Sequence, residues 1–342
     1  MNTRLLHATP DAVAPRSSFS RKAAGILRSL LRTTGVVLYH LGLARTIINL
    51  SPGRVRTLLY HAVEDQPGSY TAGLGMSISP ETFARHLDYY QRHYTLVSMQ
   101  DLIQGKPGPC TAVVTFDDGY ASVAENAVPA LEKRGIPATV YLIGKAVNGG
   151  MVWVNQLNHA LNRHPQVTMN LIHSFPGLAS IAREDVIHHV QTNFPPQLIE
   201  QLMSRLEHCV PPTAAASQLF LNREQINDLK TRAIAFGFHS NDHYNLRLCS
   251  EHTLRQQLDS SALGSLLDSR TFAYPFGYCG DREADRLEAR GFQRTMLVQE
   301  DTPQPRKSNL KRSEPSGRSA SRVFAQLEVE EPVMAWLQAA LS

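Results

Sequence analysis

Short runs of β-branched, aromatic and aliphatic residues recur along this chain and constrain its fold more than any other feature. They cover residues 57–60, 94–97, 112–116, 139–143, 233–238, 271–274 and 294–298. Helical segments separate most of them, since Ser79 and Pro80 provide a cap and a first-turn proline, and Gly291 follows a helix end. This alternation predicts an α/β fold with a parallel sheet and helices outside it.

Two carboxylates stand side by side at the end of one of these runs, where residues 115–120 read TFDDGY. Neighbouring strand residues point to opposite faces of a sheet. Asp117 and Asp118 therefore serve one site only where the strand gives way to a loop, and Gly119 permits that turn. Acidic pairs also cap helices, but the position of this pair after a buried strand favours a reaction centre in which the carboxylates have different roles.

A second group of polar residues follows another predicted strand, where residues 239–243 read HSNDH. Two imidazoles four residues apart, those of His239 and His243, lie on one face of a helical turn if one forms there. In parallel α/β sheets the chemistry gathers at the carboxyl ends of the strands, so both motifs are expected at one edge. One carboxylate and two histidines at that edge predict a facial metal site, rather than the surface or core positions that single histidines usually take.

The two motifs resemble those of the NodB-type polysaccharide deacetylase family, in which T-F-D-D-G is followed later by H-[ST]-x-x-[HN]. The similarity extends through residues 135–140 (GIPATV) and 273–277 (AYPFG), and it covers roughly residues 56–299. It implies a distorted (β/α) barrel of the polysaccharide deacetylase type.

The resemblance also implies roles for the motif residues. Asp117 is expected to be the general base, and Asp118, His239 and His243 are expected to bind a divalent metal. Zinc is the first choice, although iron, cobalt, nickel and manganese suit the same ligands.

Three further residues are expected near the substrate and the oxyanion: Tyr120, Pro275 and Phe276. In the family to which these motifs are similar, the backbone N–H that corresponds to Phe276 helps to bind the oxyanion.

Two departures from the family pattern stand out. The common arginine two residues before the motif proline is Ala273 here, and no histidine follows His252, so the usual C-terminal histidine acid is missing. Residues 58–61 read LLYH, however, and this layout resembles the circularly permuted branch that deacetylates poly-β-1,6-N-acetylglucosamine, where an N-terminal Tyr-His supplies the acid. The resemblance assigns that role to His61 and leaves open what orients Asp117.

Composition divides the chain of 342 residues, which is long enough for a full barrel with extensions. Residues 1–55 are expected to form a basic amphipathic N-terminal extension, and residues 56–342 a polysaccharide deacetylase-like catalytic domain. Residues 144–228, with Trp153 and spaced leucines, predict an inserted helical subdomain in which the tryptophan belongs to the core rather than to a sugar-stacking surface. Residues 301–322 are rich in Pro, Ser, Lys and Arg and predict a mobile loop.

Charge is distributed unevenly along the chain. The net charge is +4, but residues 1–56 hold nine Lys and Arg against the single acid Asp11, so the remainder is slightly acidic and nucleic acid is not an expected partner.

The four cysteines show no paired spacing and are expected to be free thiols: Cys110, Cys209, Cys249 and Cys279.

The N-terminal segment predicts a basic amphipathic helix over residues 20–34. Residues 35–44 are apolar but too short for the ~20 residues of a membrane span. The order of a secretory signal is absent, so we expect a cytoplasmic protein. Two readings of the helix remain open: it docks on the inner membrane surface, or it packs on the barrel.

The expected function is removal of the N-acetyl group from an N-acetylhexosamine, in a bacterial surface polysaccharide or its lipid-linked precursor. Metal, base and acid together meet the needs of amide hydrolysis. One alternative is an inactive subunit that binds carbohydrate or a biosynthetic partner, motivated by Ala273 and the missing C-terminal histidine. A non-haem iron oxygenase also uses two histidines and a carboxylate, but the alternation of strands and helices argues against it.

Overall fold

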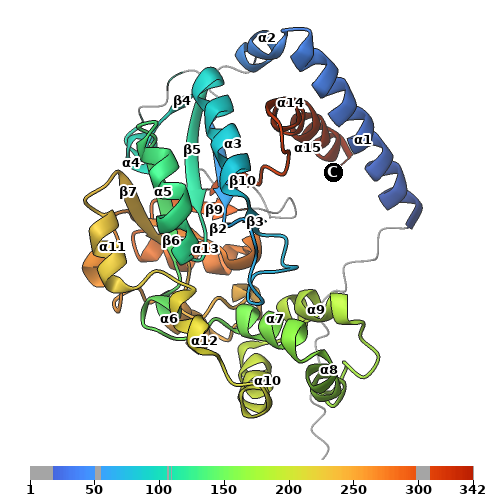
Figure 1. Cartoon of the computed structure of the whole chain (residues 1–342), viewed down its shortest axis with the longest axis vertical. Helices are drawn as coiled ribbons and strands as arrows, with labels where there is room; N and C mark the ends of the chain where they lie inside the picture. Colours follow the sequence, from blue (N-terminus) through green and yellow to red (C-terminus); the bar gives the residue numbers. More distant parts are fainter. Residues whose placement is uncertain (1–17, 51–54, 106–107, 109, 298–308, 342) are drawn as a thin grey trace, which may run out of the picture. The chain divides into compact units, whose positions relative to one another are not determined.

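Seven parallel strands close into a barrel in the computed structural model, which describes residues 18–50, 55–105, 108, 110–297 and 309–341 (Figure 1). In ring order they are β1 (Arg56–Tyr60), β10 (Asn309–Ser313), β9 (Arg294–Leu297), β8 (Thr271–Ala273), β7 (Ile234–Phe238), β6 (Ala138–Leu142) and β5 (Thr111–Phe116). The pairing of β1 with both β5 and β10 closes the ring, and β4 (Thr95–Leu96) pairs with the start of β5. All seven predicted strands are therefore present, and the expected barrel is confirmed.

The strand β10 was not predicted from the sequence. It lies inside residues 301–322, which the composition indicated to be a loop. Residues 301–308, and Val298 at the end of the predicted strand 294–298, lie outside the described residues. Leu310 is the one large apolar residue of β10, so local propensity is weak. Pairing with β9 on one side and β1 on the other makes it a strand, because tertiary context outweighs β-propensity.

The carboxyl ends of the strands lie level with one another around one rim of the barrel. Tyr60, the last residue of β1, pairs with Phe116, the last of β5, and Phe238, the last of β7, pairs with Leu142, the last of β6. The residues that follow these strands are thus brought to the same edge, as expected for a parallel α/β sheet.

Helices and a short parallel sheet complete the larger of the two compact units, Arg45–Ala320. The helices next to the strands are α2 (Ala44–Asn49), α3 (Pro80–His93), α4 (Met99–Ile103), α5 (Val128–Glu132), α6 (Gly144–Val147), α11 (Arg223–Leu229), α12 (Glu251–Gln257) and α13 (Asp281–Ala289). The short sheet pairs β2 (Ala62–Val63) with β3 (Ser77–Ile78).

Several predicted helix ends are confirmed. Ser79 caps α3 by accepting from the Thr82 backbone N–H, and Gly291 follows α13 with a φ of 79°. Ser250 caps α12 by accepting from the Thr253 backbone N–H, and this helix ends at Gln257.

Within residues 144–228, which were predicted to form an inserted helical subdomain, four helices gather at one end of the larger unit (Figure 1): α7 (Trp153–Arg163), α8 (Pro165–His173), α9 (Val186–Asn193) and α10 (Pro196–Cys209). Apolar side chains such as Leu157, Val190 and Leu202 are completely buried among these helices. Trp153 is 3% exposed, and the core position predicted for it is correct.

The smaller unit joins residues far apart in the sequence, Met1–Ala44 and Ser321–Ser342. The long helix α1 (Ser18–His40) lies beside α14 (Ala320–Phe324), the π-helical segment Ala325–Glu330 and α15 (Glu331–Leu341) (Figure 1). Arg32 of α1 hydrogen-bonds to Glu330, and the rings of Tyr39 and Phe324 lie 5.7 Å apart. The compact units thus divide the chain differently from the predicted boundary near residue 55.

Among the helices that the structure describes, none combines the length and the hydrophobicity that crossing a bilayer requires. The four cysteines are free thiols, as predicted.

Candidate active site

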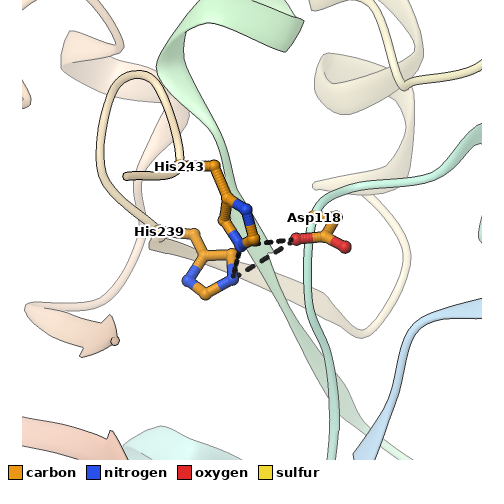
Figure 2. Close-up of side chains that lie close together, drawn as sticks. All are labelled: Asp118, His239 and His243. Carbon is orange, nitrogen blue, oxygen red and sulfur yellow. Dashed lines mark hydrogen bonds and ion pairs between the residues drawn. The ribbon is translucent and has the colours of Figure 1, made fainter. Parts of the chain in front are cut away.

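Asp118, His239 and His243 converge on one buried point at the carboxyl rim of the barrel (Figure 2). The Nε2 atoms of the two histidines lie 3.2 Å apart, and each lies 3.3 Å from Oδ1 of Asp118. That oxygen is buried without a hydrogen bond from any described residue. A carboxylate oxygen placed against two imidazole nitrogens fits a divalent cation, which these two nitrogen ligands and one oxygen ligand would hold.

The backbone around the cluster adopts strained conformations. Of the five described non-glycine residues with positive φ, four belong to this site: Asp118, Ser240, His243 and Phe276, with φ values of 69°, 66°, 58° and 59°. Each such residue costs on the order of 1–3 kcal/mol, and strain of this kind is common at functional sites.

His239 and His243 do not lie on a helical turn, contrary to the sequence interpretation. They occupy an irregular loop after β7, and the positive φ of Ser240 turns the chain back on itself. The Ser240 hydroxyl oxygen accepts from the His243 backbone N–H at 3.1 Å. The two rings are therefore brought together by a strained loop rather than by helical periodicity.

Surrounding groups fix the orientation of the two imidazoles. His239 Nδ1 donates to the backbone carbonyl of Ala273 at 2.7 Å, so the neutral ring carries its proton on Nδ1 and presents Nε2 to a cation. The indole N–H of Trp153 donates to the His243 carbonyl at 2.9 Å. The ring of Phe276 packs edge-on against the His243 imidazole, with centroids 4.5 Å apart.

The mutual electrostatics of the cluster keep the carboxylate ionised. Burial raises the pKa of Asp118, but the facing His243 and His239 outweigh it and hold that pKa well below its usual range. Burial lowers the pKa of His243 to about 4, despite the opposing effect of Asp118. An ionised carboxylate and a neutral imidazole are the forms that bind metals.

Asp117 is held by an arginine from the last strand of the barrel. Both guanidinium Nη atoms of Arg312, on β10, donate to the two carboxylate oxygens at 2.5 and 2.6 Å, and the Arg312 side chain has no exposed surface. The Arg312 guanidinium also lies 5.7 Å from the centre of the Tyr141 ring. Burial raises the pKa of Asp117, but Arg312 and His239 outweigh it and hold that pKa below its usual range.

His61 follows β1 and lines the same cavity as the carboxylates. Its Nδ1 lies 3.6 Å from a carboxylate oxygen of Glu314, the residue that follows β10. The imidazole is mostly buried, whereas about half of the Glu314 side chain is exposed, so the ion pair is partly screened by solvent. With Nδ1 facing Glu314, Nε2 is the ring nitrogen on the other side of the imidazole.

A cavity of about 290 Å³ opens at this cluster. Tyr120 and Phe276 line it, whereas Pro275 is buried and is not one of the lining residues. The Tyr120 hydroxyl accepts from the Asn155 side chain at 2.8 Å, and its ring stacks on Phe220. Tyr120 thus shapes the wall of the cavity with its hydroxyl already engaged.

The family model described as polysaccharide deacetylase matches residues 104–294, more than half of the chain. The chain belongs to the polysaccharide deacetylase family. The matched region contains both motifs that indicated this family from the sequence, and the family comprises hydrolases that remove acetyl groups from polysaccharides.

Individual relatives agree with this assignment. Over 105 residues the chain is 29% identical to YxkH of Bacillus subtilis (strain 168), described as a polysaccharide deacetylase; the match covers 28% of this chain and 34% of YxkH, so it spans about a third of that relative.

Solved structures share the deacetylase fold. The deacetylase PplD of Streptococcus pyogenes, in complex with acetate, superposes with a TM-score of 0.53 at 15% identity, over 81% of this chain and 99% of PplD. BA0330 of Bacillus anthracis superposes with a TM-score of 0.51 at 16% identity, over 81% of this chain and 69% of that chain.

Sequence reasoning missed two residues of the deacetylase site, Arg312 and Glu314. The arginine that the family usually places before the motif proline is Ala273 here, and an arginine from a different strand contacts the same carboxylate. The only sequence signal was the alternation in residues 309–313, where Leu310 and Arg312 point to one face and Lys311 to the other. It was masked by the polar composition of the surrounding stretch.

Proposed function

We propose that this protein is a metal-dependent N-deacetylase of an N-acetylhexosamine unit in a bacterial surface polysaccharide or its lipid-linked precursor. One observation carries the proposal: a metal-ligand triad, an ionised carboxylate and a histidine line one cavity of about 290 Å³. Amide hydrolysis requires these same three components, namely a cation for the oxyanion, a base for the water and an acid for the amine.

Asp117 is the proposed general base. It accepts a proton from the attacking water, whose oxygen forms a bond to the acetyl carbonyl carbon. Arg312 holds both carboxylate oxygens in place and keeps the group ionised, so the base is ready over a wide range of acidic and neutral pH. Fixed orientation of a base also lowers the entropic cost of reaching the transition state.

His61 is the proposed general acid. It donates a proton to the sugar nitrogen as the carbon–nitrogen bond breaks, and the products are acetate and an amine. The Glu314 carboxylate faces Nδ1 at 3.6 Å, so Nε2 is the proposed donor atom.

The residues that hold the metal are Asp118, His239 and His243, and zinc is the expected ion. When bound, such an ion lowers the pKa of a coordinated water and polarises the acetyl carbonyl. Phe276 lines the cavity and has a φ of 59°, and its backbone N–H is the proposed additional donor to the oxyanion.

The strands that carry His61 and Arg312 support the proposal that this chain belongs to the circularly permuted branch of the family. His61 follows the first strand of the ring and Arg312 lies on the last, and these two strands are neighbours. A poly-β-1,6-N-acetylglucosamine chain is therefore the proposed substrate. The same observation weakens the alternative of an inactive subunit, because the two groups that the sequence seemed to lack are supplied from other strands.

Acetate release tests this function directly. Purified protein loaded with zinc is incubated with a panel of N-acetylated glycans that includes β-1,6-linked N-acetylglucosamine oligomers. The Asp117→Asn variant should retain its metal and lose about 100- to 10,000-fold in rate, whereas the exposed control Asp185→Asn should match the wild type. Absence of acetate release from every glycan, with metal bound and the fold intact, would favour the inactive subunit.

The surface of α1 supports a second part of the proposal, contact with a membrane. Three apolar side chains of α1, those of Ile26, Leu30 and Val37, are more than half exposed and recur at intervals of four and seven residues along one face of the helix. Leu41, just beyond the helix end at His40, is also exposed. Arg28 and Arg32 lie on the opposite side of the helix, and Arg32 pairs with Glu330. We therefore expect the apolar face to contribute more than charge to binding at the inner membrane surface.

Flotation with vesicles that contain an anionic phospholipid tests this contact. The Leu30→Glu and Val37→Glu variants place charge on the apolar face and should lose vesicle binding. Ser29→Glu adds charge at an exposed position outside this apolar face and serves as the matched control. If the wild type does not float at low or high salt, the membrane contact is wrong and packing against another part of the chain explains the apolar face.

A further inference from the structure

A second cavity adjoins the catalytic one. Its volume is about 670 Å³, against about 290 Å³ for the catalytic cavity. Four residues line both cavities and so form the boundary between them: Leu59, Gly75, Met76 and Glu314. A glycan unit bound in the catalytic cavity therefore has room for an adjoining unit on this side.

Hydrogen bonds from α3 fix one wall of the second cavity. Two consecutive carbonyls of the segment after β10 are bound by consecutive residues of α3: the Gly317 carbonyl by His86 Nε2, and the Arg318 carbonyl by Arg85 Nε at 3.1 Å. A carbonyl can only accept, so His86 Nε2 carries the proton and Nδ1 accepts from the hydroxyl of Tyr60 at 2.9 Å. His86 and Tyr60 are both buried. The wall is thus preformed rather than assembled by a ligand.

The lining of this cavity carries more negative than positive groups. Four carboxylates face two guanidiniums there; the carboxylates are Glu64, Asp65, Glu81 and Glu314, and the guanidiniums are Arg85 and Arg318. Arg85 pairs with Glu81 at 2.6 Å, so these two charges cancel and Glu64, Asp65 and Glu314 remain against Arg318. Glu64 is half-buried and accepts from the Ser77 hydroxyl at 2.6 Å, which holds its carboxylate at the cavity wall.

We propose that the second cavity is a subsite for a neighbouring hexosamine unit that has already lost its acetyl group. The inference rests on the proposed deacetylase function and adds to it a preference for partly deacetylated chains. Deacetylation leaves a primary amine, which is cationic at neutral pH, and an acidic cavity favours a cation over a neutral acetamide. Carboxylates also accept hydrogen bonds from sugar hydroxyls, so the same wall recognises the rest of the unit.

The subsite predicts that product groups promote further reaction nearby. A chain whose first unit has been deacetylated presents an ammonium group to Glu64 and Asp65 while the next unit enters the catalytic cavity. Deacetylated units should then form contiguous blocks along a chain rather than a random distribution.

Disaccharide substrates test the subsite. Acetate release is measured for the fully N-acetylated β-1,6-linked disaccharide and for the two isomers that carry one free amine. One amine-bearing isomer should have the higher kcat/KM, by about fivefold for each carboxylate that contacts the amine at a solvent-accessible site. This advantage should shrink at high salt because the interaction is electrostatic.

Variants of the acidic wall connect the preference to the cavity. Glu64→Gln and Asp65→Asn remove charge without touching the catalytic groups, and should abolish the advantage while leaving turnover of an N-acetylated monosaccharide glycoside unchanged. Glu207→Gln, an exposed position on α10 outside both cavities, is the matched control. An advantage that survives in the double Glu64→Gln/Asp65→Asn variant, or a wild type that favours the fully acetylated disaccharide, would overturn the proposal.

A binding measurement separates failure of the subsite from failure of the proposed activity. The fully deacetylated trisaccharide has no acetyl group to lose, and its affinity is measured by titration calorimetry without turnover. Weaker binding in the double variant than in the wild type supports the subsite even if no glycan releases acetate. Equal binding in both proteins rejects the subsite even if the protein is an active deacetylase.

Discussion

Replacing Arg312 with methionine tests the electrostatic support of Asp117, the proposed general base. The substitution keeps an unbranched side chain in the barrel but removes the guanidinium, which donates two hydrogen bonds to Asp117 at 2.5 and 2.6 Å. Arg312 lowers the pKa of Asp117, whereas burial raises it. Without the arginine only burial and weaker neighbours act, so the pKa of Asp117 should rise.

The expected magnitude follows from the burial of both partners. The exposed fraction of the Arg312 side chain is 0% and that of Asp117 is 4%. Breaking such a pair commonly costs about 3–5 kcal/mol in the free energy of unfolding, or roughly 6–20 °C in Tm for a domain of this size. Because the folded-state pKa of Asp117 lies below its unfolded value, the pair stabilises the wild type at pH values above the unfolded pKa, and this stabilisation is lost as the pH falls through the folded pKa.

The pH profile of acetate release is the decisive assay. In Arg312→Met the acidic limb of kcat/KM should move to higher pH, because a protonated Asp117 cannot accept the water proton. At neutral pH the rate should fall by about 100- to 10,000-fold and should recover partly as the pH rises. Arg312→Lys keeps the charge but not the two parallel bonds, so it should lie between the wild type and Arg312→Met.

Two controls guard this interpretation. Metal content should be unchanged in Arg312→Met, since the arginine is not a ligand. In an Asp117→Asn background the Arg312→Met substitution should cost less in the free energy of unfolding, because no buried carboxylate is left without a partner. A wild-type pH profile for Arg312→Met would refute the reasoning.

Three further outcomes are expected. His243→Ala should remove the bound divalent ion, as measured by elemental analysis, together with acetate release, because two ligands do not make a stable site; retention of a full equivalent of metal would refute the ligand assignment. His61→Ala should keep the metal and lose about 100- to 10,000-fold in rate, and near-wild-type turnover would exclude His61 as the acid. Gly35→Ala places a Cβ 2.6 Å from Ala325 and should destabilise the smaller unit by about 1–3 kcal/mol, seen as faster hydrogen exchange in α1, whereas Gly25→Ala, with no atom within 4 Å of its Cβ, should not.

The site residues that could be predicted from the sequence are those that belong to a short local motif. Asp117 and Asp118 follow a strand of strongly apolar residues, and His239 and His243 follow another, so both type and position indicated a site. Arg312 gave no such indication, because its function depends on a strand formed by contacts with β1 and β9, which are distant in sequence. Local composition reports propensity, and it carries little information about pairing partners.

The conformation of the loop that carries the two histidines could not be predicted from the local sequence either. A spacing of four residues fits a helical turn, yet the loop closes through positive φ at Ser240 and His243. Non-glycine residues rarely adopt that conformation. It is held here by tertiary contacts such as the hydrogen bond from Trp153 to the His243 carbonyl.

The pairing of α1 with the C-terminal helices sets an order of events during synthesis. Arg32 and its partner Glu330 are separated by 298 positions in the chain. At translation rates of about 5–20 residues per second, roughly 15–60 s pass between the appearance of the first and the last of them. During that interval the nascent α1 lacks its C-terminal partner helices, so the face that later packs against them is exposed. A chaperone or a lipid surface can therefore bind α1 before the C-terminal helices are synthesised.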